Sequence, residues 1–253
     1  MEELQYCEIL GTQINVTSME RTLAYLKEHL ETLRGNYICV SNVHTTVMAY
    51  EDDAYRKIQN GGAMALPDGA PLALYSKKHG FANAERVTGP DLMMEVLKAS
   101  KTKGYRHFFY GATDETLAAM RTAIEKDYPG ACIAGMYAPP FRPLNASEDA
   151  IVVDMINEAK PDFIWIGLGA PKQEQWMYEH SGMLCGVSVG VGAGFDYLAG
   201  DIKRAPKIMQ KLCLEWLYRL LQDPKRLWKR YVTTNLKFIK YIKKEARFGK
   251  IGD

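Results

Sequence analysis

The chain contains 253 residues, of which 47% are apolar and 25% are charged, and its 32 Lys and Arg nearly balance its 30 Asp and Glu. This composition excludes disordered, collagen-like and low-complexity proteins, and no apolar run is long enough for a membrane-spanning helix. The acidic start Met1-Glu2-Glu3-Leu4 lacks the bases of a secretory signal, so we expect a cytoplasmic protein. The five isolated cysteines form no C-x-x-C pair and fit reduced core residues.

Apolar, β-branched segments alternate with amphipathic segments along residues 1–202. This alternation predicts an α/β fold, in which helices cover both faces of a mostly parallel sheet. In chain order, we expect a helix over 18–33, a strand over 37–41, helices over 45–60 and 90–102, a strand over 107–110, a helix over 114–128, a strand over 131–134, a helix over 148–159, a strand over 162–166, a helix over 173–180 and a strand over 185–191. Ser18 and Thr113 are expected to cap the helices that begin beside them.

The C-terminal fifth of the chain is strongly basic. Residues 203–253 contain 15 Lys and Arg against 4 Asp and Glu, a net charge of +11, whereas residues 1–202 have a net charge of −9. We therefore expect an α/β body over 1–202 and a basic helical appendage over 203–253. Such an appendage indicates an anionic partner, which can be nucleic acid, a membrane surface or a phosphorylated substrate.

From Asp223-Pro224 onward, the appendage has apolar residues at helical spacing, including Trp228 and Phe238, with basic residues on the other faces. This composition is typical of a helix that lies on an anionic bilayer. The alternatives are a terminal helix docked on the body, with its lysines solvated, and a segment that binds nucleic acid.

Glycines follow three of the expected strands, and ligands of open α/β sheets lie at the carboxyl ends of the strands. Gly111 ends the strand over 107–110, and Gly-x-Gly sequences occur at Gly167-Leu168-Gly169 and Gly190-Val191-Gly192. A glycine between a strand and a helix lets a phosphate approach the backbone. Together the three turns predict a nucleotide-type site.

Several common chemistries are excluded by the sequence. It contains no G-x-S-x-G, H-E-x-x-H or P-loop motif, and no Asp-x-Asp pair that would hold a metal against a sugar nucleotide. Glu51-Asp52-Asp53 falls within a helical pattern and is expected to be a solvated face. His44 is a lone histidine, for which we expect a structural role.

Asp68 stands out among the acidic residues. It lies in Leu66-Pro67-Asp68-Gly69-Ala70-Pro71, where two prolines and a glycine restrict the backbone around one carboxylate. Asp68 is either a turn residue or a rigidly held general base, whose pKa apolar neighbours can raise toward neutral pH. Arg86 can contact a phosphate or form an ion pair with an acidic residue.

Eight strings carry a resemblance to a known family, in order and at its spacing. They are Val40-Ser41-Asn42, Leu66-Pro67-Asp68-Gly69, Glu85-Arg86-Val87-Thr88-Gly89-Pro90-Asp91, Gly167-Leu168-Gly169-x-Pro171-Lys172-Gln173-Glu174, Gly192-Ala193-Gly194-Phe195-Asp196, Lys203-Arg204-Ala205-Pro206, Glu215-Trp216-Leu217-Tyr218-Arg219-Leu220 and Pro224-x-Arg226. Over roughly residues 8 to 231, the chain thus resembles the WecG/TagA/CpsF glycosyltransferases (glycosyltransferase family 26).

The resemblance implies a Rossmann-like transferase on the cytoplasmic leaflet. It would move a sugar, N-acetylmannosamine or a related hexose, from a UDP-sugar to a polyprenyl-diphosphate-linked sugar, with inversion and without a metal or cofactor. The products of the family serve teichoic acid, capsule and other surface glycans. The expected partners are the donor, the lipid-linked acceptor, an anionic membrane surface and, in a homodimer, a second copy of the chain, but not nucleic acid.

The resemblance also assigns roles to residues. Asp68 matches the catalytic base, Asn42 and Gln173 match positions near the donor sugar, and Arg86 matches a phosphate contact. The loops expected to hold the nucleotide contain Gly111, Tyr137, Gly169 and Asp196, and the appendage contributes Arg219, Arg226 and Arg230.

One departure from the family pattern concerns the donor. Val40 stands where the teichoic-acid branch usually has Thr, so a donor-pocket hydroxyl is either missing or supplied by Ser41, Thr45 or Thr46. Glucose, galactose and a mannosaminuronic acid are therefore alternative donor sugars.

Two other classes of function compete with this interpretation. A nucleotide-dependent oxidoreductase would need G-x-G-x-x-G after the first strand, which the sequence lacks. A non-enzymatic module that binds a nucleotide or nucleic acid through the basic appendage would leave Pro67-Asp68-Gly69 without a role.

Overall fold

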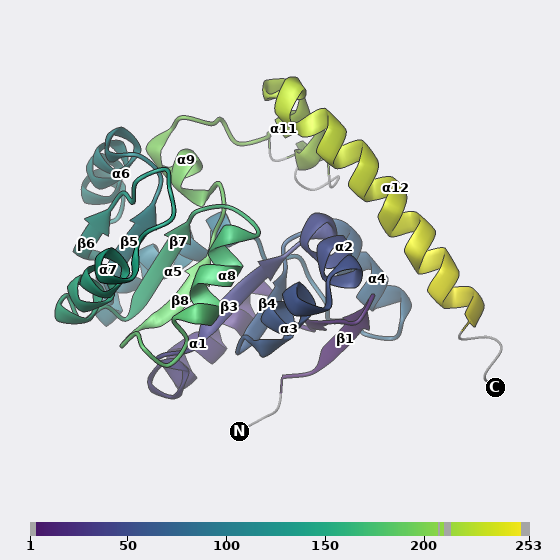
Figure 1. Cartoon of the computed structure of the whole chain (residues 1–253), viewed down its shortest axis with the longest axis horizontal. Helices are drawn as coiled ribbons and strands as arrows, with labels where there is room; N and C mark the ends of the chain where they lie inside the picture. Colours follow the sequence, from purple (N-terminus) through teal and green to yellow (C-terminus); the bar gives the residue numbers. More distant parts are fainter. Residues whose placement is uncertain (1–3, 207, 210–213, 249–253) are drawn as a thin grey trace.

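The computed structural model describes residues 4–206, 208–209 and 214–248. Six parallel strands form the central sheet in the order β4-β3-β8-β7-β5-β6 (Figure 1). Their bounds are β3 (Tyr37–Ser41), β4 (Met64–Pro67), β5 (Arg106–Gly111), β6 (Cys132–Tyr137), β7 (Phe163–Gly167) and β8 (Val187–Gly190). The expected α/β fold with a parallel, Rossmann-like sheet is therefore confirmed.

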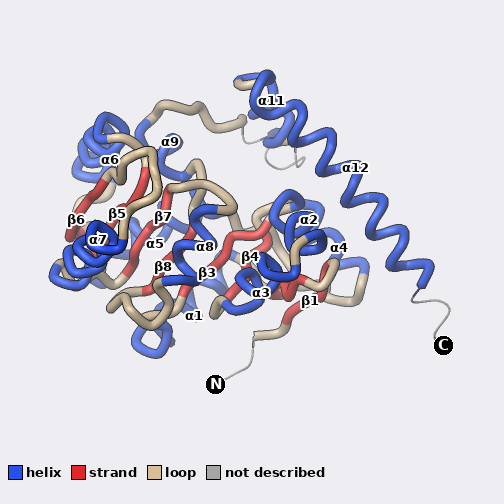
Figure 2. The backbone as a smooth tube through the Cα atoms, viewed as in Figure 1, coloured by secondary structure: helices blue, strands red, loops and turns tan. Residues whose placement is uncertain are grey.

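Helices flank both faces of the sheet, as Figure 2 shows. The two expected helix caps are confirmed. The Ser18 side chain accepts from the Arg21 N–H at the start of α1, and the Thr113 side chain accepts from the Thr116 N–H at the start of α6. The helices are α1 (Met19–Leu33), α2 (Val43–Glu51), α3 (Asp53–Gly61), α4 (Ala70–Lys78), α5 (Gly89–Lys103), α6 (Asp114–Asp127), α7 (Ala146–Glu158), α8 (Lys172–Glu179), α9 (Gly194–Ala199), α11 (Glu215–Gln222) and α12 (Pro224–Phe248).

The single helix expected over 45–60 is wrong, because the chain forms α2 and α3 with a break at Asp52. Asp52 has an extended backbone, and its carboxylate accepts from the N–H groups of Ala54 and Tyr55, which caps α3. The acidic run is exposed, as expected for a solvated face, and the Glu51 carboxylate in addition pairs with Lys237 at 2.8 Å and accepts from the Tyr241 hydroxyl. The acidic run thus ends one helix, starts the next and binds the appendage.

The sequence pattern also missed the short helices α4 and α9, strand β4 and the N-terminal hairpin. Strand β4 is only four residues long and contains Pro67 at its end, and both features weaken a strand signal. The antiparallel hairpin of β1 (Tyr6–Ile9) and β2 (Thr12–Asn15) alternates only weakly in hydrophobicity. The hairpin joins the sheet edge through Asn15, whose side chain accepts from the Ala65 N–H at 2.6 Å.

The two faces of the sheet have separate hydrophobic cores. One core gathers apolar side chains of the hairpin, α2, α7 and α8, and the other gathers those of α1, α5, α6 and α9. Neighbouring strands β3 and β8 therefore send their following helices, α2 and α9, to opposite faces. The same holds for β7 and β5, and such switch points open the sheet edge for a ligand.

Helix α12 docks on the body beside α2 (Figure 1). The side chains of Leu227 and Phe238 are 1% and 8% exposed, and the rings of Tyr241 and Tyr50 lie 4.5 Å apart. A second apolar stripe, which we call the exposed stripe, faces away from the body and contains Trp228, Val232, Leu236 and Ile239. No described helix is long and apolar enough to cross a membrane.

Docking of α12 can be tested with two adjacent residues. We expect Phe238→Ala to lower the free energy of unfolding by about 3 kcal/mol, because it removes a buried ring. Ile239→Ala, at a side chain that is 51% exposed, is the matched control and should change it by less than about 0.5 kcal/mol. Urea unfolding measures both, and equal losses would contradict the docking.

Candidate active site

Most of the expected site residues in the body follow the carboxyl ends of the strands. Ser41 and Pro67 are paired at the ends of β3 and β4, so Asn42 and Asp68 follow directly from neighbouring strands. The middle of the edge carries the loops after β8 and β7, and Gly111 ends β5. With strands about 4.8 Å apart, the distance from β3 to β5 is about 14 Å. The candidate site is therefore elongated along the edge of the sheet.

Asp68 is held by its backbone on both sides. Its N–H donates to the Ser41 carbonyl at 2.8 Å, and its carbonyl accepts from Arg86 Nε at 2.6 Å. Burial raises the pKa of Asp68 to about 6, Glu215 and Asp91 add to this, and Arg86 and a side-chain hydrogen bond with Asn42 oppose it. Such a carboxylate is ionised at neutral pH and remains basic enough to accept a proton.

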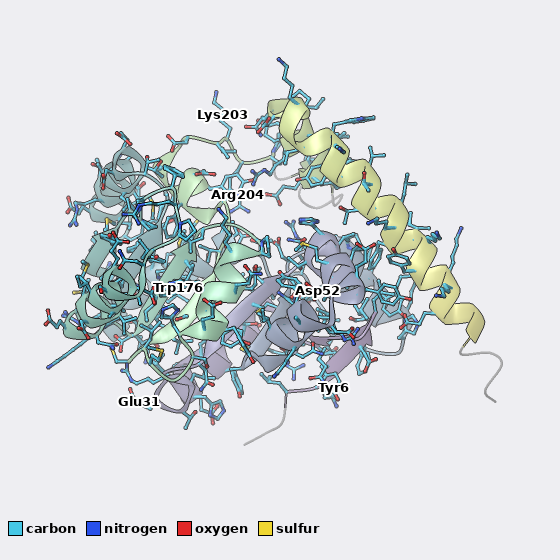
Figure 3. All side chains as sticks on the ribbon, viewed as in Figure 1. Tyr6, Glu31, Asp52, Trp176, Lys203 and Arg204 are labelled. Atoms are coloured by element: carbon cyan, nitrogen blue, oxygen red, sulfur yellow. The ribbon has the colours of Figure 1, made fainter. Side chains whose placement is uncertain are left out.

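Arg86 links Asp68 to the appendage. While its Nε binds the Asp68 carbonyl, its Nη2 forms an ion pair with Glu215 of α11 at 2.6 Å. Glu215, which is 8% exposed, also lies 3.6 Å from Arg204 Nη2, and Arg204 binds Asp91 through both Nη atoms. Arg204, labelled in Figure 3, is on the segment that leads from α9 to α11. The predicted phosphate-binding arginine is thus paired with an acid in this structure.

Asn42 and Thr45 form the N-terminal cap of α2. The Asn42 side-chain oxygen accepts from the N–H groups of His44 and Thr45, which leaves its NH₂ to donate to Asp68. The Thr45 hydroxyl accepts from the Asn42 N–H at 2.9 Å and is 1% exposed. The hydroxyls of Ser41 and Thr46 bind Gln59 and the Asn42 carbonyl. All three candidate donor-pocket hydroxyls are therefore engaged within the protein.

Gln173 lies in the middle of the edge and is 3% exposed. Its Oε1 accepts from the backbone N–H of Gly192 at 3.1 Å, and its Nε2 donates to Glu174 at 2.7 Å. The side chain therefore joins α8 to the loop after β8, at the place expected for a donor-pocket residue.

The nucleotide candidates follow the other strands. Gly111 has a φ of +131°, and a Cβ there would lie 2.7 Å from the Gly167 carbonyl, so only glycine fits between β5 and β7. Gly169 also has a positive φ, of +77°. The Tyr137 ring is stacked with the Tyr110 ring, and the ring centres are 6.1 Å apart. Since β4 and β6 are opposite edge strands, Tyr137 is about 24 Å from Asp68 along the sheet and not beside it.

The remaining candidates lie in α9 and in the appendage. Asp196 is in the first turn of α9. The guanidinium groups of Arg219 and Arg204 both lie over the Tyr197 ring of α9, at 5.3 and 5.2 Å from its centre. Arg226 and Arg230 belong to α12, and their side chains lie outside the described residues. The structure thus brings Arg219 to the body.

Comparisons with known proteins decide the family. Residues 7–251 match the model of the Glycosyl transferase WecG/TagA/CpsF family. An N-acetylglucosaminyldiphosphoundecaprenol N-acetyl-beta-D-mannosaminyltransferase of Bacillus spizizenii is 31% identical over 247 residues, 93% of this chain and 94% of the relative. A protein of the same name from Staphylococcus aureus is 33% identical over 223 residues, 87% of this chain and 86% of the relative. The chain belongs to the WecG/TagA/CpsF family.

Membership confirms the resemblance seen in the sequence and the prediction of a hexosyltransferase. The sequence analysis missed several residues of this WecG/TagA/CpsF protein that the site brings together. Glu215 and Arg204 stood in strings that resemble the family, yet their charges gave no sign of their partners. Glu174 is 0% exposed, but its sequence neighbours Lys172, Gln173 and Gln175 are polar and gave no sign of its burial.

The raised pKa of Asp68 makes a prediction for this glycosyltransferase. A folded-state pKa of about 6, against 3.8 when unperturbed, means that ionisation of Asp68 opposes folding. Stability from this group is fully present below about pH 4 and is lost as the pH rises through 6. We expect Asp68→Asn to escape this loss, so its advantage over the wild type should grow by about 1–3 kcal/mol between pH 4 and 8. Urea unfolding across this range measures it, and a constant difference would refute the pKa.

Proposed function

We propose that the protein transfers a hexose from a UDP-sugar to the hydroxyl group of a sugar linked through diphosphate to a polyprenyl lipid, with inversion. The observation that carries this proposal is Asp68, a partly buried carboxylate at the sheet edge with a pKa of about 6. The two relatives support it, since their names specify a diphosphoundecaprenol-linked N-acetylglucosamine acceptor and a β-mannosaminyl product.

In the proposed step, the Asp68 carboxylate accepts the proton of the acceptor hydroxyl. The acceptor oxygen forms a bond to the anomeric carbon, and the bond from that carbon to the β-phosphate oxygen breaks. The electron pair leaves with UDP, whose added charge needs a cation. Arg86 is the nearest described cation to Asp68 and would offset that charge once the diphosphate replaces Glu215 as its partner.

The donor sugar is the finer part of the proposal. The names of the relatives favour N-acetylmannosamine. The hydroxyls of Ser41, Thr45 and Thr46 each donate their one proton within the protein, whereas the NH₂ groups of Asn42 and Gln173 each keep a second N–H, so we propose these two amides as the donor-pocket groups. A panel of UDP-sugars, assayed with a short-chain lipid-diphosphate-N-acetylglucosamine acceptor and EDTA, tests donor, acceptor and metal independence together. Acceptor-dependent UDP release with one donor would support the proposal, and release with none, also on vesicles, would contradict it.

The role of Asp68 predicts the kinetics of a variant. Asp68→Asn keeps the shape of the side chain but cannot accept the proton, so turnover should fall by about 10²-fold or more. The affinity for the UDP-sugar, measured by calorimetry, should stay within several-fold. Turnover near that of the wild type would exclude Asp68 as the base.

We further propose that the appendage holds the protein on the inner face of the cell membrane. The four apolar side chains of the exposed stripe lie within an arc of about 80° around the axis of α12, since successive residues of an α-helix are about 100° apart. The exposed Lys229 and Lys240 border one side of this arc, and the exposed Lys243 lies within it near the end of the helix. An apolar stripe bordered by bases suits a helix that lies at the surface of an anionic bilayer.

Vesicle binding tests the exposed stripe without undocking the helix. We expect Trp228→Ala combined with Leu236→Ala to weaken binding to vesicles of anionic phospholipid by at least about tenfold, because apolar area is lost. The control is Ile151→Ala on α7, which removes an apolar side chain that is 62% exposed elsewhere and should bind as the wild type does. Sedimentation with vesicles measures this, and equal binding by all three proteins would remove the stripe from membrane contact.

A further inference from the structure

Glu174 is a buried carboxylate to which the proposed chemistry gives no role. It lies in the first turn of α8 and is 0% exposed. In the described part of the chain, no Lys, Arg or His forms an ion pair with it. Burial raises the pKa of Glu174, and hydrogen bonds from Gln173, its own N–H and Tyr55 partly offset that increase. A buried, unpaired carboxylate is costly, so its hydrogen bonds need an explanation.

One arm of these hydrogen bonds reaches the loop after β3. The Tyr55 hydroxyl donates to Glu174 Oε2 at 3.1 Å, and Gln59 Nε2 donates to the Tyr55 oxygen at 3.1 Å. Gln59 Oε1 in turn accepts from the Ser41 hydroxyl at 2.7 Å. Since Ser41 precedes Asn42, this arm runs from Glu174 to the strand end that carries the partner of Asp68.

The other arm reaches the loop after β8 through Gln173. Gln173 Nε2 donates to Glu174 Oε1 at 2.7 Å, and Gln173 Oε1 accepts from the Gly192 N–H at 3.1 Å. The amide also lies against Gly190, where a Cβ would approach Nε2 to 2.9 Å. The Gln173 amide therefore has a partner at each end and no side chain at Gly190 to displace it.

The direction of these bonds explains why a carboxylate stands at position 174. In both arms every donor points toward Glu174, from Ser41 through Gln59 and Tyr55 on one side and from Gly192 through Gln173 on the other. Only a group that accepts at both oxygens completes both arms, and an ionised carboxylate is such a group. A side chain without those oxygens leaves two buried donors unpaired.

We infer that Glu174 is a positioning residue of the donor pocket, which fixes the Gln173 amide in one orientation between its own carboxylate and the Gly192 N–H. The inference rests on the proposed function, in which Gln173 contacts the donor sugar. Through Tyr55 and Gln59, the same carboxylate ties the Gln173 amide to the strand end that positions Asn42.

Kinetics of variants at position 174 test the inference. Glu174→Met keeps the length of the side chain but removes both acceptor oxygens, so kcat/KM for the UDP-sugar should fall by at least about tenfold. Glu174→Gln can keep its oxygen on Gln173 and turn its NH₂ toward Tyr55, so it should lose less. Glu179→Met, at an exposed residue of the same helix, is the matched control and should match the wild type.

A double-mutant cycle separates positioning from a purely structural role. If Glu174 acts through Gln173, then Gln173→Ala combined with Glu174→Met should be no slower than Gln173→Ala alone, within about twofold. Losses that multiply, or a Glu174→Met protein as active as the wild type, would overturn the inference. Circular dichroism at the assay temperature confirms that each variant is folded.

A measurement without substrate keeps the network testable if the proposed function fails. In NMR spectra of the ligand-free protein, the side-chain NH₂ of Gln173 should exchange with water at least tenfold more slowly than that of exposed Gln175. The protection should disappear in Glu174→Met and persist in Glu174→Gln. If the wild type transfers no sugar, the proposed function is wrong, while unprotected Gln173 in the wild type would overturn the network itself.

Discussion

Parallel pairing of the six strands is the constraint on which the whole site depends. Because every strand runs the same way, every strand end delivers its next residue to one edge, and residues more than a hundred positions apart become neighbours there. Gly111 lets β5 and β7 lie close together at this edge, and Gly167 leaves room for the Phe195 ring of α9, to which a Cβ at 167 would approach within 2.7 Å. A side chain at 111 would push β5 and β7 apart, and one at 167 would displace α9 from the sheet.

Ion pairs connect the body to α11 at this edge. The ion pairs run from Arg86 to Glu215, then to Arg204 and then to Asp91, so the charges alternate in sign. Hydrogen bonds from Arg204 and Thr88 lower the pKa of Asp91, although burial opposes them. The Asp68 carboxylate is beside this network, where two acids raise and one arginine lowers its pKa. The position of α11 and the basicity of Asp68 are therefore coupled: moving Glu215 away would free Arg86 and lower the pKa of Asp68 at once.

The features predicted correctly from the sequence are those set by residues close together in the chain, namely strands and helix starts. Hydrophobic alternation located five of the six sheet strands, and Ser18 and Thr113 marked helix starts, because a cap and its helix are adjacent in the chain. It failed at β4, where a proline ends a short buried strand, and at Asp52, whose side chain breaks a continuous helical pattern. The prolines and glycine around Asp68 singled it out as a candidate, and the resemblance to the family pointed to Gln173. Glu215 and Glu174, the partners of Arg86 and Gln173, were not assigned, since ion pairs and buried hydrogen bonds across the fold leave no periodic trace.

Helix α12 divides its surface between two neighbours. Its buried side chains face α2, while the exposed stripe points elsewhere, so the helix need not leave the body to meet a lipid surface. If the exposed stripe binds a bilayer as proposed, the sheet edge would be held at a fixed height and tilt relative to that bilayer. The enzyme's search for a lipid-linked acceptor would then be confined to the plane of the membrane, because enzyme and acceptor would lie at the same height along the membrane normal. Only lateral diffusion and rotation about that normal would remain.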